Sequence, residues 1–254
     1  MSALTHLYLN NNKLINFDCL CIIDGLSIKY LNLGNNSLYD DEYLDLKQYD
    51  FESITSLNLD GNKFKKISMR GYLTHLERVK EVSMANNLLT LIESDYFDPL
   101  TNLEVLNLAF NNISYIRKAF YNMRKLKTLI LSHNSLSEFD NFDFPSPSSL
   151  QYLAIDYNQL VLMPNIMEHT GSLKKIAIDG NPWSCKCLKQ YRKVFHDRNI
   201  QEVCADDVKH ACMTNIHSNN NNCYIDVFSA AQIKIVNLVT PNSTYYCVLN
   251  EFDQ

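Results

Sequence analysis

Residues 103–113 read LEVLNLAFNNI, and residues 126–136 read LKTLILSHNSL. Both runs fit the pattern Leu-x-x-Leu-x-Leu-x-x-Asn-x-Leu, in which other aliphatic residues can replace leucine. The central x-Leu-x-Leu-x segment alternates buried and variable positions with a period of two, which is typical of a short strand with one buried face. A strand unit that recurs in this form predicts a repeat protein.

The pattern occurs eight times between Leu4 and Asn181. Every copy carries an asparagine at the same place, namely Asn12, Asn36, Asn62, Asn87, Asn111, Asn134, Asn158 and Asn181. Successive asparagines are separated by 24, 26, 25, 24, 23, 24 and 23 residues. In the last copy, Pro182 and Trp183 follow the asparagine in place of the usual ending. This regular spacing predicts a solenoid of stacked coils.

Each coil has a predictable interior. The leucines of one coil have nothing to pack against except the neighbouring coils, so the strands should form one parallel sheet. The repeated asparagines should form a ladder, because a side-chain amide can satisfy backbone groups left unpaired where the strand turns away. Phe97 and Leu100, and again Phe120 and Met123, share one offset and should fill the side of the coil opposite the sheet.

On these residues the chain resembles leucine-rich repeat proteins, whose repeats have roughly 20 to 29 residues. The resemblance covers residues 1 to about 183. It implies an α/β fold, a solenoid with a curved parallel sheet on its concave face. We expect residues 1–181 to form the repeats, without an N-terminal cap, and residues 182–254 to form a cysteine-rich C-terminal cap and tail.

The start of that cap is the most specific motif in the chain. Residues 181–187, Asn-Pro-Trp-Ser-Cys-Lys-Cys, resemble the opening of the cysteine-rich flank of extracellular leucine-rich repeat proteins. Leu188, Tyr191 and Phe195 follow at i, i+3 and i+7, which predicts a short amphipathic helix that covers the end of the core. The resemblance implies a cap closed by disulfides among Cys185, Cys187, Cys204, Cys212, Cys223 and Cys247.

In that family the first cysteine bonds the third and the second bonds the fourth. This implies Cys185 with Cys204. It also implies Cys187 with Cys223, which leaves Cys212 and Cys247 for each other. Six cysteines allow 15 connectivities, so the pairing stays open. Cys19 and Cys21 lie on the first return segment, by which we mean the part of a repeat that leads from one strand to the next. They could bond each other, bond another chain or stay reduced.

Zinc is the alternative for the C-terminal cysteines. Its possible ligands are Cys185, Cys187, His196, Cys204, His210 and Cys212. The C-x-C spacing is not that of the usual zinc knuckle, and the repeat context favours disulfides. We therefore predict no metal and no other cofactor.

The composition of the chain limits the classes of partner that it can bind. The 254 residues are 46% hydrophobic, which suits a large core, and the net charge of -5 supplies no broad basic field for nucleic acid. Only 6 glycines are present, without a cluster that could cradle a phosphate. No apolar run reaches the roughly 18 to 20 residues of a membrane span. The first residues lack the features of a signal peptide.

Three sequons, Asn35, Asn112 and Asn242, are candidate glycosylation sites in a secreted protein. Asn242, in a polar segment, is the best acceptor, while Asn35 and Asn112 lie beside the ladder and should be hindered. Catalysis is not predicted, because hydrolase motifs such as G-x-S-x-G are absent. His133, near Ser132 and Asp156 in register, is better explained as a binding or solvated residue than as a base.

Function should lie on the outward side chains of the sheet, which the strands align in columns. The candidate protein-binding residues are Val105, Phe110, Thr128, Ile130, His133, Tyr152 and Tyr157. Such an apolar and aromatic patch is enriched at protein interfaces. The alternative is that these residues are merely tolerated at the surface.

The sequence therefore predicts a non-enzymatic recognition module. It resembles secreted or cell-surface leucine-rich repeat proteins, including the arthropod leucine-rich immune and Toll-type ectodomain group, and we expect it to be extracellular. The resemblance implies a protein ligand or co-receptor, with a glycan or microbial surface polymer as second choice; a homo- or heterodimer stays open. An intracellular scaffold with reduced or zinc-bound cysteines and an adhesion or matrix protein are the alternatives.

Overall fold

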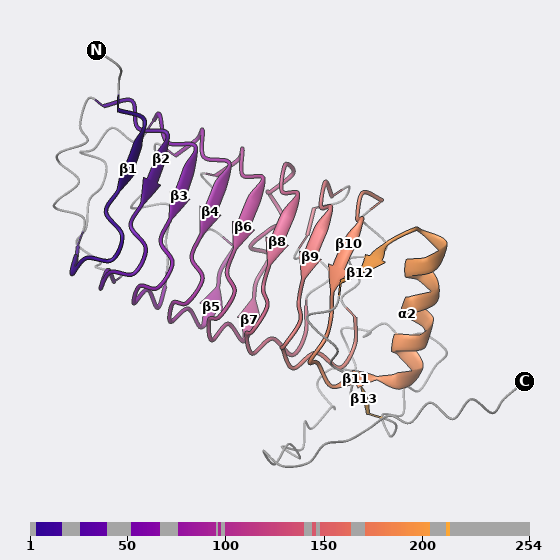
Figure 1. Ribbon diagram of the computed structural model, residues 1–254. Helices are drawn as coiled ribbons and strands as arrows, with labels where there is room; N and C mark the ends of the chain where they lie inside the picture. Colours follow the sequence, from indigo (N-terminus) through magenta and orange to yellow (C-terminus); the bar gives the residue numbers. More distant parts are fainter. Residues whose placement is uncertain are drawn as a thin grey trace, which may run out of the picture.

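A computed structural model describes residues 4–16, 26–39, 52–66, 76–94, 96–97, 100–139, 144–145, 148–163, 171–203 and 212–213. Its main feature is a nine-stranded sheet in which all neighbours are parallel. The strands are, in order, β1 (His6–Tyr8), β2 (Tyr30–Asn32), β3 (Ser56–Asn58), β4 (Glu81–Ser83), β6 (Val105–Asn107), β8 (Thr128–Ile130), β9 (Tyr152–Ala154), β10 (Lys175–Ala177) and β12 (Gln201–Glu202). They lie side by side along one face of the solenoid (Figure 1).

The register of this sheet stacks equivalent residues of successive repeats. Leu106 pairs with Leu129, and Leu129 pairs with Leu153. These three side chains are fully buried. The leucines thus form continuous columns that run through the core, as the repeat pattern predicts.

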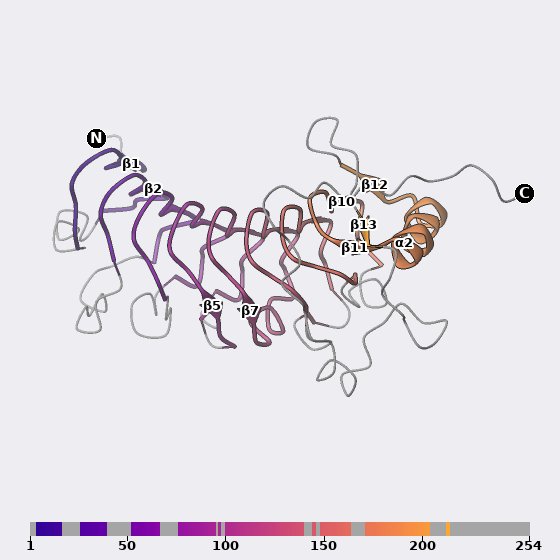
Figure 2. The same ribbon diagram turned by 90° about the horizontal axis from the view of Figure 1, so that it is seen from below.

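The other side of each coil is filled as the sequence predicts. Phe97, Phe120 and Met123 are buried in the same core as the leucines. Two short strands, β5 (Leu91–Ile92) and β7 (Tyr115–Ile116), form a separate parallel pair. The view from below shows this pair well away from the main sheet, on the return side of the coils (Figure 2).

The repeated asparagines link neighbouring coils. The Asn134 amide nitrogen donates to the carbonyls of Leu108, Leu131 and Ser132 at 3.0, 3.0 and 3.3 Å. Its oxygen accepts from the Ile113 N–H at 2.9 Å. The same four contacts recur at Asn36, Asn62, Asn87, Asn111, Asn158 and Asn181. Asn12 differs, since it is exposed and donates only to the carbonyls of Leu9 and Asn10.

A helix covers the last coil. Helix α2 (Cys185–Asp197) follows β11 (Trp183–Ser184), which pairs with β13 (Cys212–Met213). The helix buries Leu188, Tyr191 and Phe195, the three residues that predicted it. The helix lies beyond β10 and β12 at the end of the sheet (Figure 1). In the described part of the chain, no helix is both long and apolar enough to cross a membrane.

Only some of the cysteines in these predictions belong to the described residues. Cys185 and Cys187 are both disulfide-bonded. Their predicted partners lie outside the described residues, as do Cys19, Cys21, Cys247, His210 and Asn242. Within the described residues, no three histidine, cysteine or acidic side chains gather in a group that could hold a metal ion.

Candidate protein-binding surface

The sheet brings four of the predicted binding residues together. Val105, Thr128 and Tyr152 occupy one row across β6, β8 and β9. Ile130 lies in the next row, between Asn107 and Ala154. Val105, Thr128, Ile130 and Tyr152 are half-buried. Neighbouring strands lie about 4.8 Å apart, so these side chains form one continuous outward surface.

Tyr152 is the largest side chain of this row. Burial, and secondarily the negative charge of Asp156, raise the pKa of its phenol above the ordinary value. The phenol is neutral at physiological pH even at its ordinary pKa, so the hydroxyl keeps its proton for donation. A neutral phenol on an apolar body is a common anchor at protein interfaces.

The residue before each ladder asparagine has a left-handed backbone. Its φ angle is positive at Asn11, Asn35, Gly61, Asn86, Phe110, His133, Tyr157 and Gly180, between 51° and 65°. Glycine and asparagine adopt this conformation readily. A phenylalanine or tyrosine there is uncommon and costs free energy. Three consecutive repeats nevertheless place aromatic rings at this position.

These rings form a stack. The ring centroids of Phe110 and His133 are 4.2 Å apart with an interplanar angle of 11°, and those of His133 and Tyr157 are 4.3 Å apart at 8°. The stack ends against Gly180, where an added Cβ would lie only 2.5 Å from the Tyr157 ring. At the other end Phe110 is 50% exposed. The sequence predicted these residues as a patch but not their stacking, although their spacing by one repeat was the available signal.

We predict that Phe110→Asn leaves stability nearly unchanged. The variant loses one stacking contact, worth about 0.5 to 1.5 kcal/mol. It gains a residue that tolerates the left-handed backbone, which is worth about 1 kcal/mol. Denaturant unfolding should therefore give a free energy within about 1 kcal/mol of the wild type. A loss above about 2 kcal/mol would mean that the stack mainly holds the coils together.

A second aromatic group lies on the first two strands, and the sequence reasoning did not select it. The ring of Tyr30 stacks on His6 at 5.8 Å and contacts Tyr8 at 5.3 Å in a tilted arrangement. Tyr8 is exposed. The signal was present in the column of outward residues. This group lies on β1 and β2 at the edge of the sheet, whereas the stacked rings follow β6, β8 and β9. The stacked group has the more regular geometry.

The polar residues around His133 do not form a catalytic arrangement. The Ser132 hydroxyl donates to Asp156 at 2.5 Å, and both side chains are buried. A catalytic serine would instead bond to the histidine that removes its proton. A similar bond joins Ser83 to Asp60 at 2.6 Å. The serine–aspartate pairs therefore link neighbouring coils.

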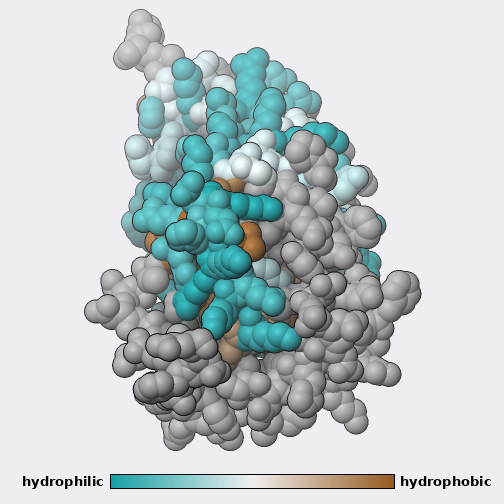
Figure 3. Space-filling view, turned by 90° about the vertical axis from the view of Figure 1, so that its right-hand side faces the viewer, coloured by the Kyte–Doolittle hydropathy of each residue, from teal (hydrophilic) through white to brown (hydrophobic). Residues whose placement is uncertain are grey.

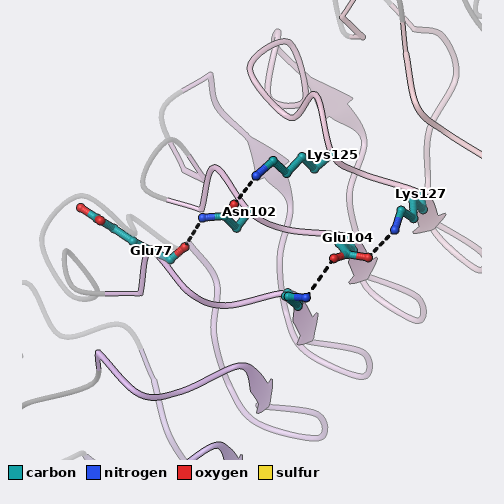
Figure 4. Close-up of polar contacts among 6 residues, drawn as sticks. Glu77, Asn102, Glu104, Lys125 and Lys127 are labelled. Carbon is teal, nitrogen blue, oxygen red and sulfur yellow. Dashed lines mark hydrogen bonds and ion pairs between the residues drawn. The ribbon is translucent and has the colours of Figure 1, made fainter.

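A charged row borders the candidate surface where the strands begin. Lys127 donates to Glu104 at 2.6 Å, and Lys80 lies 3.4 Å from the same carboxylate. The bond from Lys127 holds the pKa of Glu104 below its ordinary value. Lys125 also donates to Asn102, which donates to the Glu77 carbonyl (Figure 4). This row gives the apolar surface a polar margin, as interfaces commonly have.

The two described sequons differ from each other. Asn35 donates to the side-chain oxygen of Asn11 at 3.0 Å. The side chains of Asn35 and Asn112 are both exposed, although we expected the ladder to hinder them. The reason is that only the neighbouring ladder residues, Asn36 and Asn111, turn into the core. Because the Asn35 amide is engaged by Asn11, Asn112 offers the more available acceptor amide.

We predict that Asn112 carries a glycan when the chain is secreted from a eukaryotic host, and that Asn35 does not. Asn112→Gln should remove one glycan mass from the intact protein. Asn35→Gln is the matched control and should leave the mass pattern unchanged, apart from the substitution. Mass spectrometry that finds the glycan on Asn35 alone would contradict the prediction.

Comparison with known proteins agrees with this geometry. A family model described as "Leucine rich repeat" matches residues 52–113, 77–136 and 114–160. The fold is that of a leucine-rich repeat solenoid. An internalin from Listeria monocytogenes, a solved structure, aligns with a TM-score of 0.62 at 17% identity, covering 83% of this chain and 56% of the internalin. This similarity concerns the leucine-rich repeat fold alone.

Two curated relatives match part of the chain. Human Toll-like receptor 8 is 30% identical over 156 residues, which is 59% of this chain and 15% of the receptor. Human lumican is 31% identical over 160 residues, which is 61% of this chain and 44% of lumican. The chain thus spans less than half the length of these relatives.

Proposed function

We propose that this chain is a non-catalytic recognition module. It binds a protein partner through the concave sheet face of repeats five to seven. The binding residues are Val105, Phe110, Thr128, Ile130, His133, Tyr152 and Tyr157. The stack of Phe110, His133 and Tyr157 at strained backbone positions carries the proposal. Strained residues persist where the surrounding structure holds them, and they cluster at binding sites.

The surface is suited to binding because it is already rigid. The ladder asparagines and the parallel strands fix the backbone, and the rings hold one another in place. Binding a partner would therefore cost little free energy for ordering this surface. Aromatic anchors next to half-buried aliphatic side chains are the usual centre of a protein interface.

The proposed setting is extracellular recognition, in innate immunity or signalling. Two observations favour it. One relative is named as a Toll-like receptor. In addition, both cysteines of α2, Cys185 and Cys187, are disulfide-bonded. Disulfides are typical of oxidising compartments. In this proposal, disulfides involving Cys204, Cys212, Cys223 and Cys247 complete the cap. The match to lumican keeps an adhesion or matrix role as the alternative.

Site-specific photo-crosslinking tests the proposed face. A benzophenone amino acid replaces Tyr152 in one protein and Tyr121 in another; Tyr121 is 49% exposed on the return side. Both proteins are irradiated in the extracellular protein mixture of the source tissue. We expect protein adducts from position 152 and few from position 121. Equal yields, or adducts from position 121 alone, would contradict binding through the sheet face.

A further inference from the structure

The outer face of helix α2 is positively charged, although the chain as a whole carries a negative net charge. The helix carries three lysines and one arginine, Lys186, Lys189, Lys193 and Arg192, as well as His196 and one acidic side chain, Asp197. The whole chain has a net charge of -5. The end view shows mainly hydrophilic residues over this part of the molecule, with hydrophobic residues visible only in small patches (Figure 3).

Three of these lysines form one exposed row, which we call the basic cap face. Lys186, Lys189 and Lys193 lie at i, i+3 and i+7, opposite the buried residues of the helix. The row extends over about 10 Å along the helix axis. Arg192 is bound to Glu202 at 2.9 Å and is not part of it. None of the three lysines makes an ion pair with a side chain in the described residues.

Two more lysines lie at the same end of the solenoid. Lys175 begins β10 and pairs with Gln201 of β12, the strand that follows α2. Lys174 precedes it, and its carbonyl accepts from the Gln201 N–H at 2.8 Å. Both side chains are exposed, and neither makes an ion pair with another described residue. The unpaired positive charge therefore continues from the cap helix to the last repeat.

This pattern does not serve the stability of the helix. Lys186 lies in the first turn, where the helix dipole disfavours a positive charge. Lys189 and Lys193 are four residues apart, so they repel each other. The first turn contains no acidic residue that would offset these costs. Local rules of this kind are broken mainly at functional sites.

The composition of the face argues against three kinds of partner. A membrane-binding helix inserts its apolar face, but here Leu188, Tyr191 and Phe195 are buried in the core. The centre of a protein interface is poor in lysine and rich in aromatic residues, and the two aromatic residues of α2 are the buried ones. The same burial removes Tyr191 and Phe195 as stacking partners for a nucleic-acid base, which leaves His196 as the one exposed ring of the helix.

We propose that the basic cap face binds a linear sulfated polysaccharide. Unpaired lysines in a row bind a flexible polyanion through charge alone, by releasing its counterions. The disulfide-bonded cysteines of α2 favour an oxidising compartment, where such polysaccharides occur. This site is separate from the proposed sheet-face site and shares only its extracellular setting. Bound polysaccharide would hold the module at a matrix or cell surface.

Heparin is the probe that tests this proposal. Titration calorimetry of the full chain in 0.15 M salt should show binding, which should weaken steeply as salt is added. K189Q/K193Q should lower the affinity at least tenfold and reduce the salt dependence. K189R/K193R should retain binding. K13Q/K63Q, which removes two exposed lysines from the first and third repeats, should stay within twofold of the wild type.

Several outcomes would overturn the proposal. These are no heparin binding in 0.15 M salt, an equal loss in the two glutamine double variants, or tighter binding to duplex DNA of the same length and charge. Tighter binding to phosphatidylserine vesicles would also overturn it, in favour of a membrane surface. Unfolding midpoints measured on all variants separate a loss of binding from a loss of folding. Because all of the substituted lysines are exposed, these midpoints should hardly change.

Discussion

Replacing Asn134 with alanine is expected to lower the free energy of unfolding by about 3 to 5 kcal/mol. The substitution removes one acceptor and three donor contacts at a buried site between coils five and six. Each buried backbone group left without a partner costs about 1 to 3 kcal/mol. In a solenoid, such a loss weakens the interface on which the neighbouring coil depends.

Denaturant unfolding followed by circular dichroism measures this loss. Asn112→Ala is the matched control, because it removes the same side chain from an exposed position and should change the free energy by less than about 0.5 kcal/mol. If Asn134→Ala loses less than 1 kcal/mol, the ladder asparagine is not the main link between these coils.

Trp183→Ala is expected to have the second large effect, about 3 to 5 kcal/mol. The indole is buried between the last coil and the cap, and its N–H donates to the Ile178 carbonyl at 2.7 Å. The alanine variant loses both the packing and the bond. Trp183→Phe keeps most of the volume and should lose only about 1 to 2 kcal/mol.

The location of the Trp183 effect can also be measured. Amide hydrogen exchange should rise first in β10 and α2, which adjoin the tryptophan, and last in β3 and β4. This order follows because each coil contacts only its neighbours. A uniform rise along the solenoid would instead show that the molecule unfolds as one cooperative unit.

The sequence determined the fold because one period carried both the buried leucines and the asparagine ladder. Leu106, Leu129 and Leu153 could be aligned from spacing alone, and the structure stacks them. The cap helix was equally predictable, since Leu188, Tyr191 and Phe195 share one face. These predictions succeed because burial depends on position within the repeat.

The candidate site was less predictable, for two physical reasons. Ring geometry depends on a left-handed backbone at Phe110, His133 and Tyr157, and aromatic residues do not signal that conformation. The basic cap face was hidden by the chain's net negative charge, because composition averages over surfaces that a partner meets separately. The register of the strands and the exposure of the side chains, which only the structure gives, were needed to recognise the ring stack and the basic cap face.

The measurement that most directly tests the recognition role compares two double variants as capture reagents. Tyr152→Ala/Tyr157→Ala alters the proposed face, and Tyr115→Ala/Tyr121→Ala alters two exposed tyrosines of the return segments. Both proteins, with the wild type, are immobilised at equal density and exposed to the extracellular proteins of the source tissue. We predict that the proteins bound by the wild type are retained by the return-segment variant and lost by the sheet-face variant. Retention by the sheet-face variant, with both variants folded, would contradict the proposed function.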